Sequence, residues 1–281
     1  MTFDPDASRA AELAFPATAG DPCAGRPEPG PPDHYCRVAQ GFLYASTRLP
    51  PVRTQRPAAV LLLAVAAHEL FGIETARRGL RCGAAAVQPL VARRLLAQGV
   101  PLVSLNLHPE HAGFLRWRGI AGDGVLPLSR AAFAAHDAHL AAMARGLPDR
   151  ASGQALCDAL LATLHPLLPP VGADPPLRAT LLQWLRVEPE LGLPELARRL
   201  GISYHRMSHC FSQALGVPYR HWRAYARAQR AAAQFKAART LTGIAHEAGF
   251  TDSAHLSHTW QRTYGLSPSF VRHDNSVQAI L

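Results

Sequence analysis

The 281-residue sequence lacks a hydrophobic stretch long enough to span a membrane. Its longest uninterrupted apolar run is Ala58–Ala67, whereas a transmembrane helix needs about 20 residues. The first 33 residues carry a net charge of −4 and no apolar segment, which is the wrong chemistry for a secretory signal peptide. We therefore expect a cytoplasmic protein with no membrane partner.

Cysteine is scarce, and metal-binding motifs are missing. The five cysteines are an odd number without a CxxC pair, which argues against a disulfide framework and a zinc knuckle. No HxH…E arrangement occurs, and the nearest approach, His108-Pro109-Glu110-His111, is typical of a polar turn. We predict no metal, no cofactor and no enzyme, because no nucleophile–base pair can be assembled either. The cysteines are expected to be small buried hydrophobic residues: Cys23, Cys36, Cys82, Cys157 and Cys210.

Lysine is nearly absent, since Lys236 is the only lysine among 29 basic residues. The formal net charge of +9 is unevenly distributed, with +7 over residues 34–128 and +7 over residues 175–281. A localised basic excess at the carboxyl terminus favours a polyanionic partner. The excess over 34–128 would suit a small anionic effector held by one or two arginines. The alternative for both segments is a solvated surface in an arginine-rich protein.

Composition and periodicity divide the chain and predict an α+β protein. Residues 1–33 are rich in Pro, Gly, Ala and Asp and are expected to be a flexible tail. Residues 34–128 are expected to be β-rich, 129–168 helical, 169–176 a linker, and 177–274 a second, all-helical domain. The β-rich segment is read from short apolar runs: Ala58–Leu70, Gly72–Ala76, Leu80–Val87, Leu95–Ala97 and Val100–Leu107.

Two helices are expected in residues 129–168, with Ser129 and Ser152 as their N-caps. The second helix carries a leucine stripe. This stripe packs either on the β-rich segment or against its twin in a homodimer, and the sequence leaves both readings open.

Residues 177–274 contain one helical pattern twice. In the first copy, the helix Leu193–Leu200 is followed by a glycine turn and by a second helix from Ser203 to about Ala214. The second copy has a turn one residue longer and Asp252 as its cap. Each second helix buries an i, i+4 apolar pair, and equivalent residues are 49 positions apart, so we predict two helix-turn-helix units. Their structural positions are Ala197, Gly201, Met207 and Phe211 in the first unit and Ala245, Gly249, Leu256 and Trp260 in the second.

A bridging helix is expected over Tyr219–Ala237. At 1.5 Å per residue it would be roughly 28 Å long, close to the ~34 Å between successive major-groove faces of B-DNA. Both second helices would then enter adjacent grooves of one duplex, so we predict double-stranded DNA as the partner.

The stretch Gly192–Arg272 closely resembles the DNA-binding domain of the AraC/XylS family of bacterial transcription regulators. The residues that carry the resemblance are LPELARRLGISYHRMSHCFSQALGVPYRHW and LTGIAHEAGFTDSAHLSHTWQRTYGLSPSFVR. The resemblance implies a cupin-like amino-terminal domain that senses an effector, dimerisation through the helices that follow it, and an activator that contacts RNA polymerase. It also implies these base-reading residues: His205, Ser208, His209, Ser253, Ala254, Ser257 and His258.

The sequence departs from the family pattern at His209 and His258, where relatives often carry arginine. Arginine grips guanine with two donors, whereas imidazole offers one good contact at a time, so we expect an altered site preference. Phosphate contacts should fix the orientation without selecting sequence. We expect them from backbone amides at the helix caps and from Arg206, Arg223, Arg227 and Arg262.

The function expected from these observations is effector-responsive, sequence-specific regulation of transcription, with activation more common than repression in the family. A regulator without a small-molecule ligand, controlled by a protein partner, is the main alternative. A cupin-type enzyme with a helical appendage is the third, and it would need a catalytic constellation that the sequence does not offer.

Overall fold

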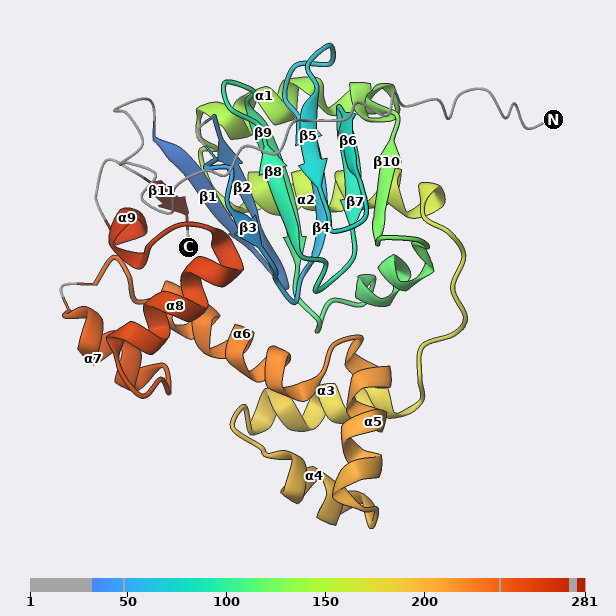
Figure 1. Cartoon of the computed structure of the whole chain (residues 1–281), viewed down its shortest axis with the longest axis vertical. Helices are drawn as coiled ribbons and strands as arrows, with labels where there is room; N and C mark the ends of the chain where they lie inside the picture. The colour runs from blue at the N-terminus through green and yellow to red at the C-terminus, as the bar shows by residue number, and fades with distance from the viewer. Residues whose placement is uncertain (1–31, 48, 238, 273–276, 281) are drawn as a thin grey trace.

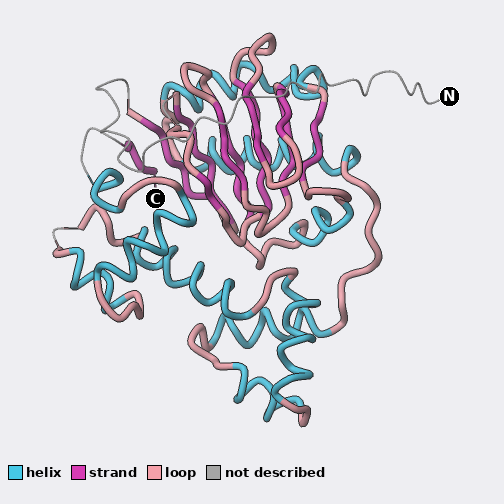
Figure 2. Tube along the Cα trace, in the orientation of Figure 1, coloured by secondary structure: helices cyan, strands magenta, loops and turns pink. Residues whose placement is uncertain are grey.

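The computed structural model describes residues 32–47, 49–237, 239–272 and 277–280. A β-rich domain, formed mainly by residues 33–168, stands above a helical domain formed by residues 177–272 (Figure 1). Figure 2 shows strands and helices layered in the first and helices alone in the second. The α+β organisation predicted from the sequence is confirmed.

The β-rich domain contains two sheets. The larger has the strand order β10-β7-β4-β9-β2-β1-β11, and the smaller has the order β3-β8-β5-β6. The larger sheet comprises β1 (Asp33–Val38), β2 (Gly41–Ser46), β4 (Ala59–Ala64), β7 (Ala84–Val87), β9 (Leu102–Leu107), β10 (Val125–Leu128) and β11 (Val277–Ile280). The smaller comprises β3 (Arg53–Thr54), β5 (Phe71–Glu74), β6 (Gly79–Cys82) and β8 (Arg93–Leu96).

The central strands are buried on both faces, which explains their continuous apolar sequence. In β4, Leu61 and Leu63 point into the core beneath the helices, whereas Val60 and Leu62 belong to the core beside the smaller sheet. The run Leu80–Val87, expected as one segment, is divided at Gly83 between β6 and β7, which lie in different sheets. A Cβ at Gly83 would lie 2.9 Å from the Cβ of Arg130, so a larger residue is excluded there.

Helices cover the outer face of the larger sheet. A 3-10 helix at Arg130–His136 leads into α1 (Asp137–Arg145), and α2 (Arg150–Leu164) follows. Leu156, Leu160 and Leu164 of α2 are buried within the chain, so the leucine stripe packs on its own β-rich domain.

Of the two N-caps predicted for this helical segment, Ser129 stands at a cap position without a capping hydrogen bond, and Ser152 was wrong. Ser129 precedes a 3-10 helix and makes no side-chain cap. The N-cap of α2 is Asp149, whose carboxylate accepts from the Ser152 amide at 2.7 Å. A carboxylate satisfies the orphan amide as well as a hydroxyl does, and Asp149 has the extended backbone that an N-cap requires.

The helical domain begins after an irregular segment at residues 168–176. Its helices are α3 (Leu177–Val187), α4 (Leu193–Leu200), α5 (Tyr204–Leu215), α6 (Tyr219–Ala232), α7 (Leu241–Glu247), α8 (Ser253–Tyr264) and α9 (Pro268–Arg272). The bridging helix α6 ends five residues earlier than expected and is therefore about 21 Å long. Phe235, beyond its end, is buried against Trp260 with ring centroids 4.7 Å apart.

The last described residues return to the β-rich domain. Strand β11 pairs in parallel with β1, Val277 opposite Asp33 and Ala279 opposite Tyr35, and becomes the edge of the larger sheet. Asp33 thus belongs to a strand and not to the predicted tail, while residues 1–31 of that tail lie outside the described residues. No described helix is long and apolar enough to cross a membrane.

The cysteines are mostly buried, as expected. Cys36, Cys82 and Cys157 are buried free thiols, and Cys210 is half-buried on α5. Burial raises the pKa of Cys82 and Cys157 to about 12, so both remain protonated at neutral pH. Cys23 lies outside the described residues.

Candidate functional site

The first predicted helix-turn-helix unit is formed by α4 and α5. Gly201 takes the left-handed conformation (φ 63°) between the helices, and the Ser203 hydroxyl caps α5 by accepting from the Arg206 amide. Met207 and Phe211 are fully buried, and Ala197 is buried where the helices cross. The buried face of α5 therefore packs on this core, and the packing fixes the direction in which the exposed face points.

The second unit, α7 and α8, repeats this construction. Gly249 has φ 86°, and the Asp252 carboxylate caps α8 by accepting from the His255 amide at 2.7 Å. Leu256 and Trp260 are buried, as is Ala245 on α7. Both units thus present the amino-terminal half of a capped helix to solvent.

The predicted base-reading residues lie on these two helices. His205, His209, Ala254 and His258 are exposed, and the three serines of the set are half-buried. The rings of His205 and His209 meet edge to face, with centroids 4.7 Å apart. The Ser257 hydroxyl donates to the Ser253 carbonyl within α8, which leaves its lone pairs to accept from an outside donor.

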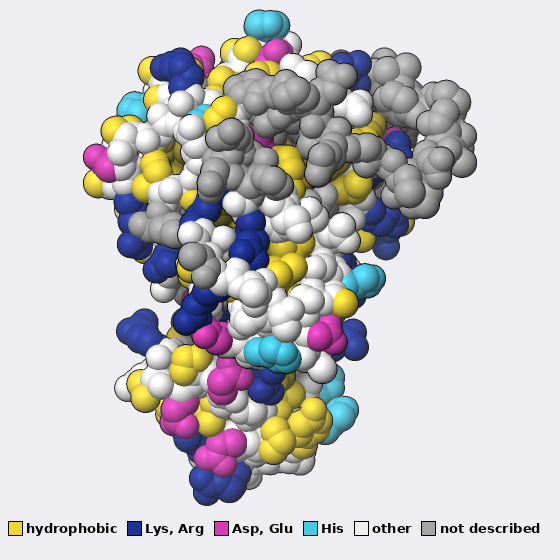
Figure 3. All heavy atoms as spheres, turned by 90° about the vertical axis from the view of Figure 1, so that its left-hand side faces the viewer, with side chains coloured by type: hydrophobic (Ala, Val, Ile, Leu, Met, Phe, Trp, Pro, Cys, Tyr) yellow, Lys and Arg dark blue, Asp and Glu magenta, His cyan; other side chains and the backbone are white. Residues whose placement is uncertain are grey.

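The predicted phosphate-contacting arginines are in four different situations. Arg206 is exposed at the start of α5. Arg223 pairs with Glu190, and Arg227 lies beside the Gly249 turn. Arg262 is exposed but donates to Gln55 of the β-rich domain at 3.2 Å. On the face in Figure 3, basic side chains gather between the β-rich and helical parts, and acidic ones accompany them in the lower, helical part.

The two domains are joined through the turn at residues 108–111. Arg178 of α3 is buried and donates to the carbonyls of Pro109 and His111 at 2.8 Å, and the indole of Trp222 donates to the Glu110 carboxylate. Burial raises the pKa of Glu110 and lowers the pKa of His108 to about 4. The segment forms a polar turn, as expected, and its titratable side chains are half-buried between the two domains.

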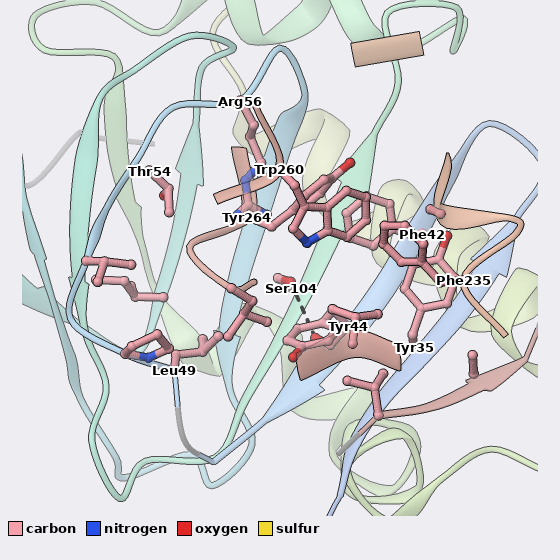
Figure 4. Close-up of a pocket in the computed structure, with 18 of the residues that line it drawn as sticks. Tyr35, Phe42, Tyr44, Leu49, Thr54, Arg56, Ser104, Phe235, Trp260 and Tyr264 are labelled. Carbon is pink, nitrogen blue, oxygen red and sulfur yellow. Dashed lines mark hydrogen bonds between the residues drawn. The ribbon is translucent and has the colours of Figure 1, made fainter. Parts of the chain in front are cut away.

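A cavity lies between the larger sheet, the smaller sheet and the helices α6 and α8 (Figure 4). Its walls are mostly apolar and aromatic, and they come from both domains. The labelled residues Tyr35, Phe42 and Tyr44 belong to β1 and β2, whereas Phe235, Trp260 and Tyr264 belong to the helical domain. Val277 and Ala279 of β11 also line it.

Two arginines contribute positive charge to this cavity, with Arg93 buried and Arg56 half-buried. Arg56 donates to Asn106 at 2.8 Å, but its Nε has no hydrogen-bond partner among the described residues. Among the described residues, Arg93 donates only a long hydrogen bond, to the Val91 carbonyl, and burial lowers its pKa to about 9, with Arg56 adding repulsion. Among the described residues, no carboxylate lines the cavity. Buried cations without a counter-charge are costly, so this site suits an anionic group.

Residues 34–128 contain eleven arginines, and we expected one or two of them to hold an anion. The sequence does not indicate which ones. Arg56 and Arg93 come close because β8 pairs with β3, in which Thr54, two residues before Arg56, lies opposite Arg93. No local periodicity reports such a long-range pairing.

Comparison with known proteins identifies the helical domain. Residues 196–274 match the family model described as a helix-turn-helix domain. No curated protein matches the sequence. Among solved structures, an apo variant of ToxT from Vibrio cholerae is similar, with a TM-score of 0.57 and 8% identity over 86% of this chain and 100% of that chain. ToxT from the same organism with a bound unsaturated fatty acid has a TM-score of 0.51 and 9% identity, over 82% of this chain and 93% of that chain.

The likeness to ToxT is one of fold, since the sequences have diverged so far. The match over residues 196–274 contains both helix-turn-helix units, with α6 between them. This chain therefore carries an AraC-type helix-turn-helix DNA-binding domain, joined to a β-rich amino-terminal domain in the two-domain fold of ToxT.

Proposed function

We propose that this protein is a sequence-specific transcription regulator whose DNA binding is controlled by an anionic amphiphile held between its two domains. The observation that carries the proposal is a pair of arginines, the half-buried Arg56 and the buried Arg93, in an apolar cavity that has walls from both domains. A carboxylate there would pair with the guanidinium groups, and an apolar chain would lie along the aromatic wall.

The ligands of two fold neighbours support a chemical class for the effector. ToxT has been solved with an unsaturated fatty acid and with (E)-4-(8-methylnaphthalen-1-yl)but-3-enoic acid. Both are carboxylic acids with a large apolar body. The cavity described above offers complementary chemistry, which supports a long-chain carboxylic acid as the effector of this chain.

On DNA, α5 and α8 would each enter the major groove, in consecutive turns of one duplex. His205, Ser208 and His209 would read one half of the site, and Ser253, Ala254, Ser257 and His258 the other. Arg206, Arg223, Arg227 and Arg262 would hold phosphates. Activation would follow from contact with RNA polymerase bound nearby in the cytoplasm. A homodimer through residues 129–168 would use the exposed side of α2, because its leucine stripe is already buried.

Control by the ligand follows from the shared cavity walls. A molecule that contacts both domains stabilises one relative placement of α8 and the β-rich domain, and this placement either favours or opposes the grip on DNA. Linkage then requires that DNA change the affinity for the ligand by the same factor as the ligand changes the affinity for DNA.

A titration tests the proposal. The full chain is titrated with palmitoleic acid and with its methyl ester while tryptophan fluorescence is followed, since Trp260 lines the cavity. We expect saturable binding of the acid, at least tenfold weaker binding of the ester, and a similar loss for the acid in Arg56→Gln and Arg93→Gln. Equal binding of acid and ester would reject the anion site. No binding of either would favour a regulator controlled by a protein partner.

A further inference from the structure

Glu190, in the loop between α3 and α4, is held by two arginines of the bridging helix. One carboxylate oxygen accepts from Arg223 at 3.1 Å, and the other accepts from Arg230. About a third of each arginine side chain is exposed, and 57% of the Glu190 side chain is exposed. The cluster is therefore open to a ligand from solvent.

The cluster links the two helix-turn-helix units. The loop that carries Glu190 leads into α4 of the first unit. Arg230 also donates to the carbonyl of Ala248, in the turn of the second unit, at 3.2 Å. Arg227 lies against the same turn, because a Cβ added to Gly249 would be 3.2 Å from its Nε. Arginines of α6 thus lie where the two units come together.

The arginines face away from the β-rich domain. At about 100° per residue, Arg223, Arg227 and Arg230 form one stripe along α6. Trp222 and Tyr225 lie on a different side, where Trp222 binds Glu110 and Tyr225 contacts His108. Docking of the β-rich domain therefore leaves the arginine stripe uncovered.

Two guanidinium groups that both donate to one carboxylate could donate in the same way to the oxygens of a phosphodiester. We propose that Glu190 occupies the place of a DNA phosphate between Arg223 and Arg230, and that a backbone phosphate displaces it when both units engage one duplex. This inference rests on the proposed DNA-binding function. It adds Arg230 to the phosphate-contacting set and assigns Glu190 as an internal competitor for the same site.

The competition would serve specificity. Phosphate contacts supply the sequence-independent part of DNA affinity. An internal carboxylate that competes for two arginines weakens binding to every duplex. A DNA sequence that makes base contacts with both α5 and α8 would offset this loss of affinity, whereas a random sequence would not.

The test compares Glu190→Gln with the wild-type chain. Glutamine keeps one acceptor oxygen for the arginines but removes the charge. Fluorescence anisotropy with a 40-bp duplex of mixed sequence, at about 100 mM salt, should show about fivefold tighter binding by the variant, the effect expected when two exposed ion pairs stop competing. Thermal melting by circular dichroism establishes that both proteins are folded.

The matched control is Glu195→Gln. Glu195 also bridges two arginines, Arg198 and Arg199, but within α4. Glu195→Gln removes one negative charge, as Glu190→Gln does, and we expect it to change the affinity for DNA by less than twofold. In an Arg223→Gln/Arg230→Gln background, Glu190→Gln should no longer tighten binding.

Each remaining outcome overturns the inference. Weaker DNA binding and a lower melting temperature in Glu190→Gln would show that Glu190 stabilises the arrangement of the two units. Equal gains from Glu190→Gln and Glu195→Gln would reduce the effect to net charge. Failure of the wild-type chain and every variant to bind duplex DNA would reject the proposed function as well, whereas wild-type binding that Glu190→Gln leaves unchanged would reject this inference alone.

Discussion

The guanidinium carbon of Arg56 lies 5.6 Å from the centroid of the Tyr264 ring. Arg56 belongs to the β-rich domain, and Tyr264 is the last residue of α8, the second helix with predicted base-reading residues. The Tyr264 hydroxyl also accepts from Gln229 of α6. A ligand that attracts Arg56 would therefore alter the surroundings of α8, so this pair links the cavity to a helix that carries predicted base-reading residues.

Replacing Tyr264 by leucine should uncouple the two sites. Leucine retains apolar contact with the cavity but removes the ring over which Arg56 lies. We expect palmitoleic acid to bind still, while its effect on DNA affinity falls to less than twofold. Tyr264→Phe is the control, since it keeps the ring and should preserve coupling. The measurement is DNA anisotropy with and without the acid, and full coupling in the leucine variant would contradict the role of this contact.

Removing the last five residues should open the cavity. Strand β11 supplies Val277 and Ala279 to the wall, and the Val277 side chain is buried. A chain ending at residue 276 loses this burial, at a cost of about 1.5–3 kcal/mol, and exposes the edge of β1. We expect faster amide hydrogen exchange at Tyr35 and Cys36 and weaker binding of palmitoleic acid. Gln278→Ala, at an exposed position, should leave both unchanged; equal exchange in the shortened chain would show that β11 does not protect β1.

His209 and Arg206 should separate sequence reading from positioning. His209→Ala should change the preferred bases in one half of the site, because it removes a side chain at the groove. Arg206→Ala should weaken all sequences alike and reduce the slope of log affinity against log salt by about 1 if it contacts a phosphate. Selection from a random duplex pool measures the change in base preference, and a salt titration measures the change in slope. A uniform loss in both variants would contradict this assignment.

Met207→Ala should destabilise the first unit without touching its surface. Met207 lies on the buried face of α5 and is fully buried, so truncation should lower the free energy of unfolding by about 2–5 kcal/mol. Chemical denaturation measures this cost. His205→Ala, on the exposed face of the same helix, should change stability by less than about 0.5 kcal/mol. Comparable losses in the two variants would place the core of this unit elsewhere.

Stability should fall as the pH drops from about 6.5 toward 4, in part because of His108. Burial lowers its folded-state pKa to about 4, below the unfolded value of 6.5, so the unfolded chain binds the extra proton across this range. His108 alone would account for about 3 kcal/mol. His108→Gln should lose this part of the pH dependence, as denaturation at pH 7 and pH 4.5 would measure. An unchanged pH dependence would show that the ring is hydrated in solution.

The sequence was most informative where structure depends on neighbours along the chain. Both helix-turn-helix units follow from the i, i+4 burial of Met207 with Phe211 and of Leu256 with Trp260, and from glycines that need positive φ. Their caps, Ser203 and Asp252, were predicted correctly.

Features that depend on distant contacts were not predictable. The alanine-rich end of the bridge, residues 233–237, has high helix propensity, yet α6 stops at Ala232 and Phe235 packs on Trp260. Four residues near the carboxyl terminus give no sign that they pair with β1. The same holds for two side-chain clusters. Only the folded structure brings Arg56 close to Arg93 and places Glu190 between two arginines.

The central claim is that α5 and α8 of one chain grip consecutive major grooves. Its most direct test begins with a duplex selected from a random pool and footprinted with the wild-type protein. We expect two protected segments about 10 bp apart, centre to centre, and loss of specific binding when 5 bp are inserted between them, because the insertion turns one segment to the opposite face of the helix. Undiminished specific binding to the duplex with the insertion would contradict the account.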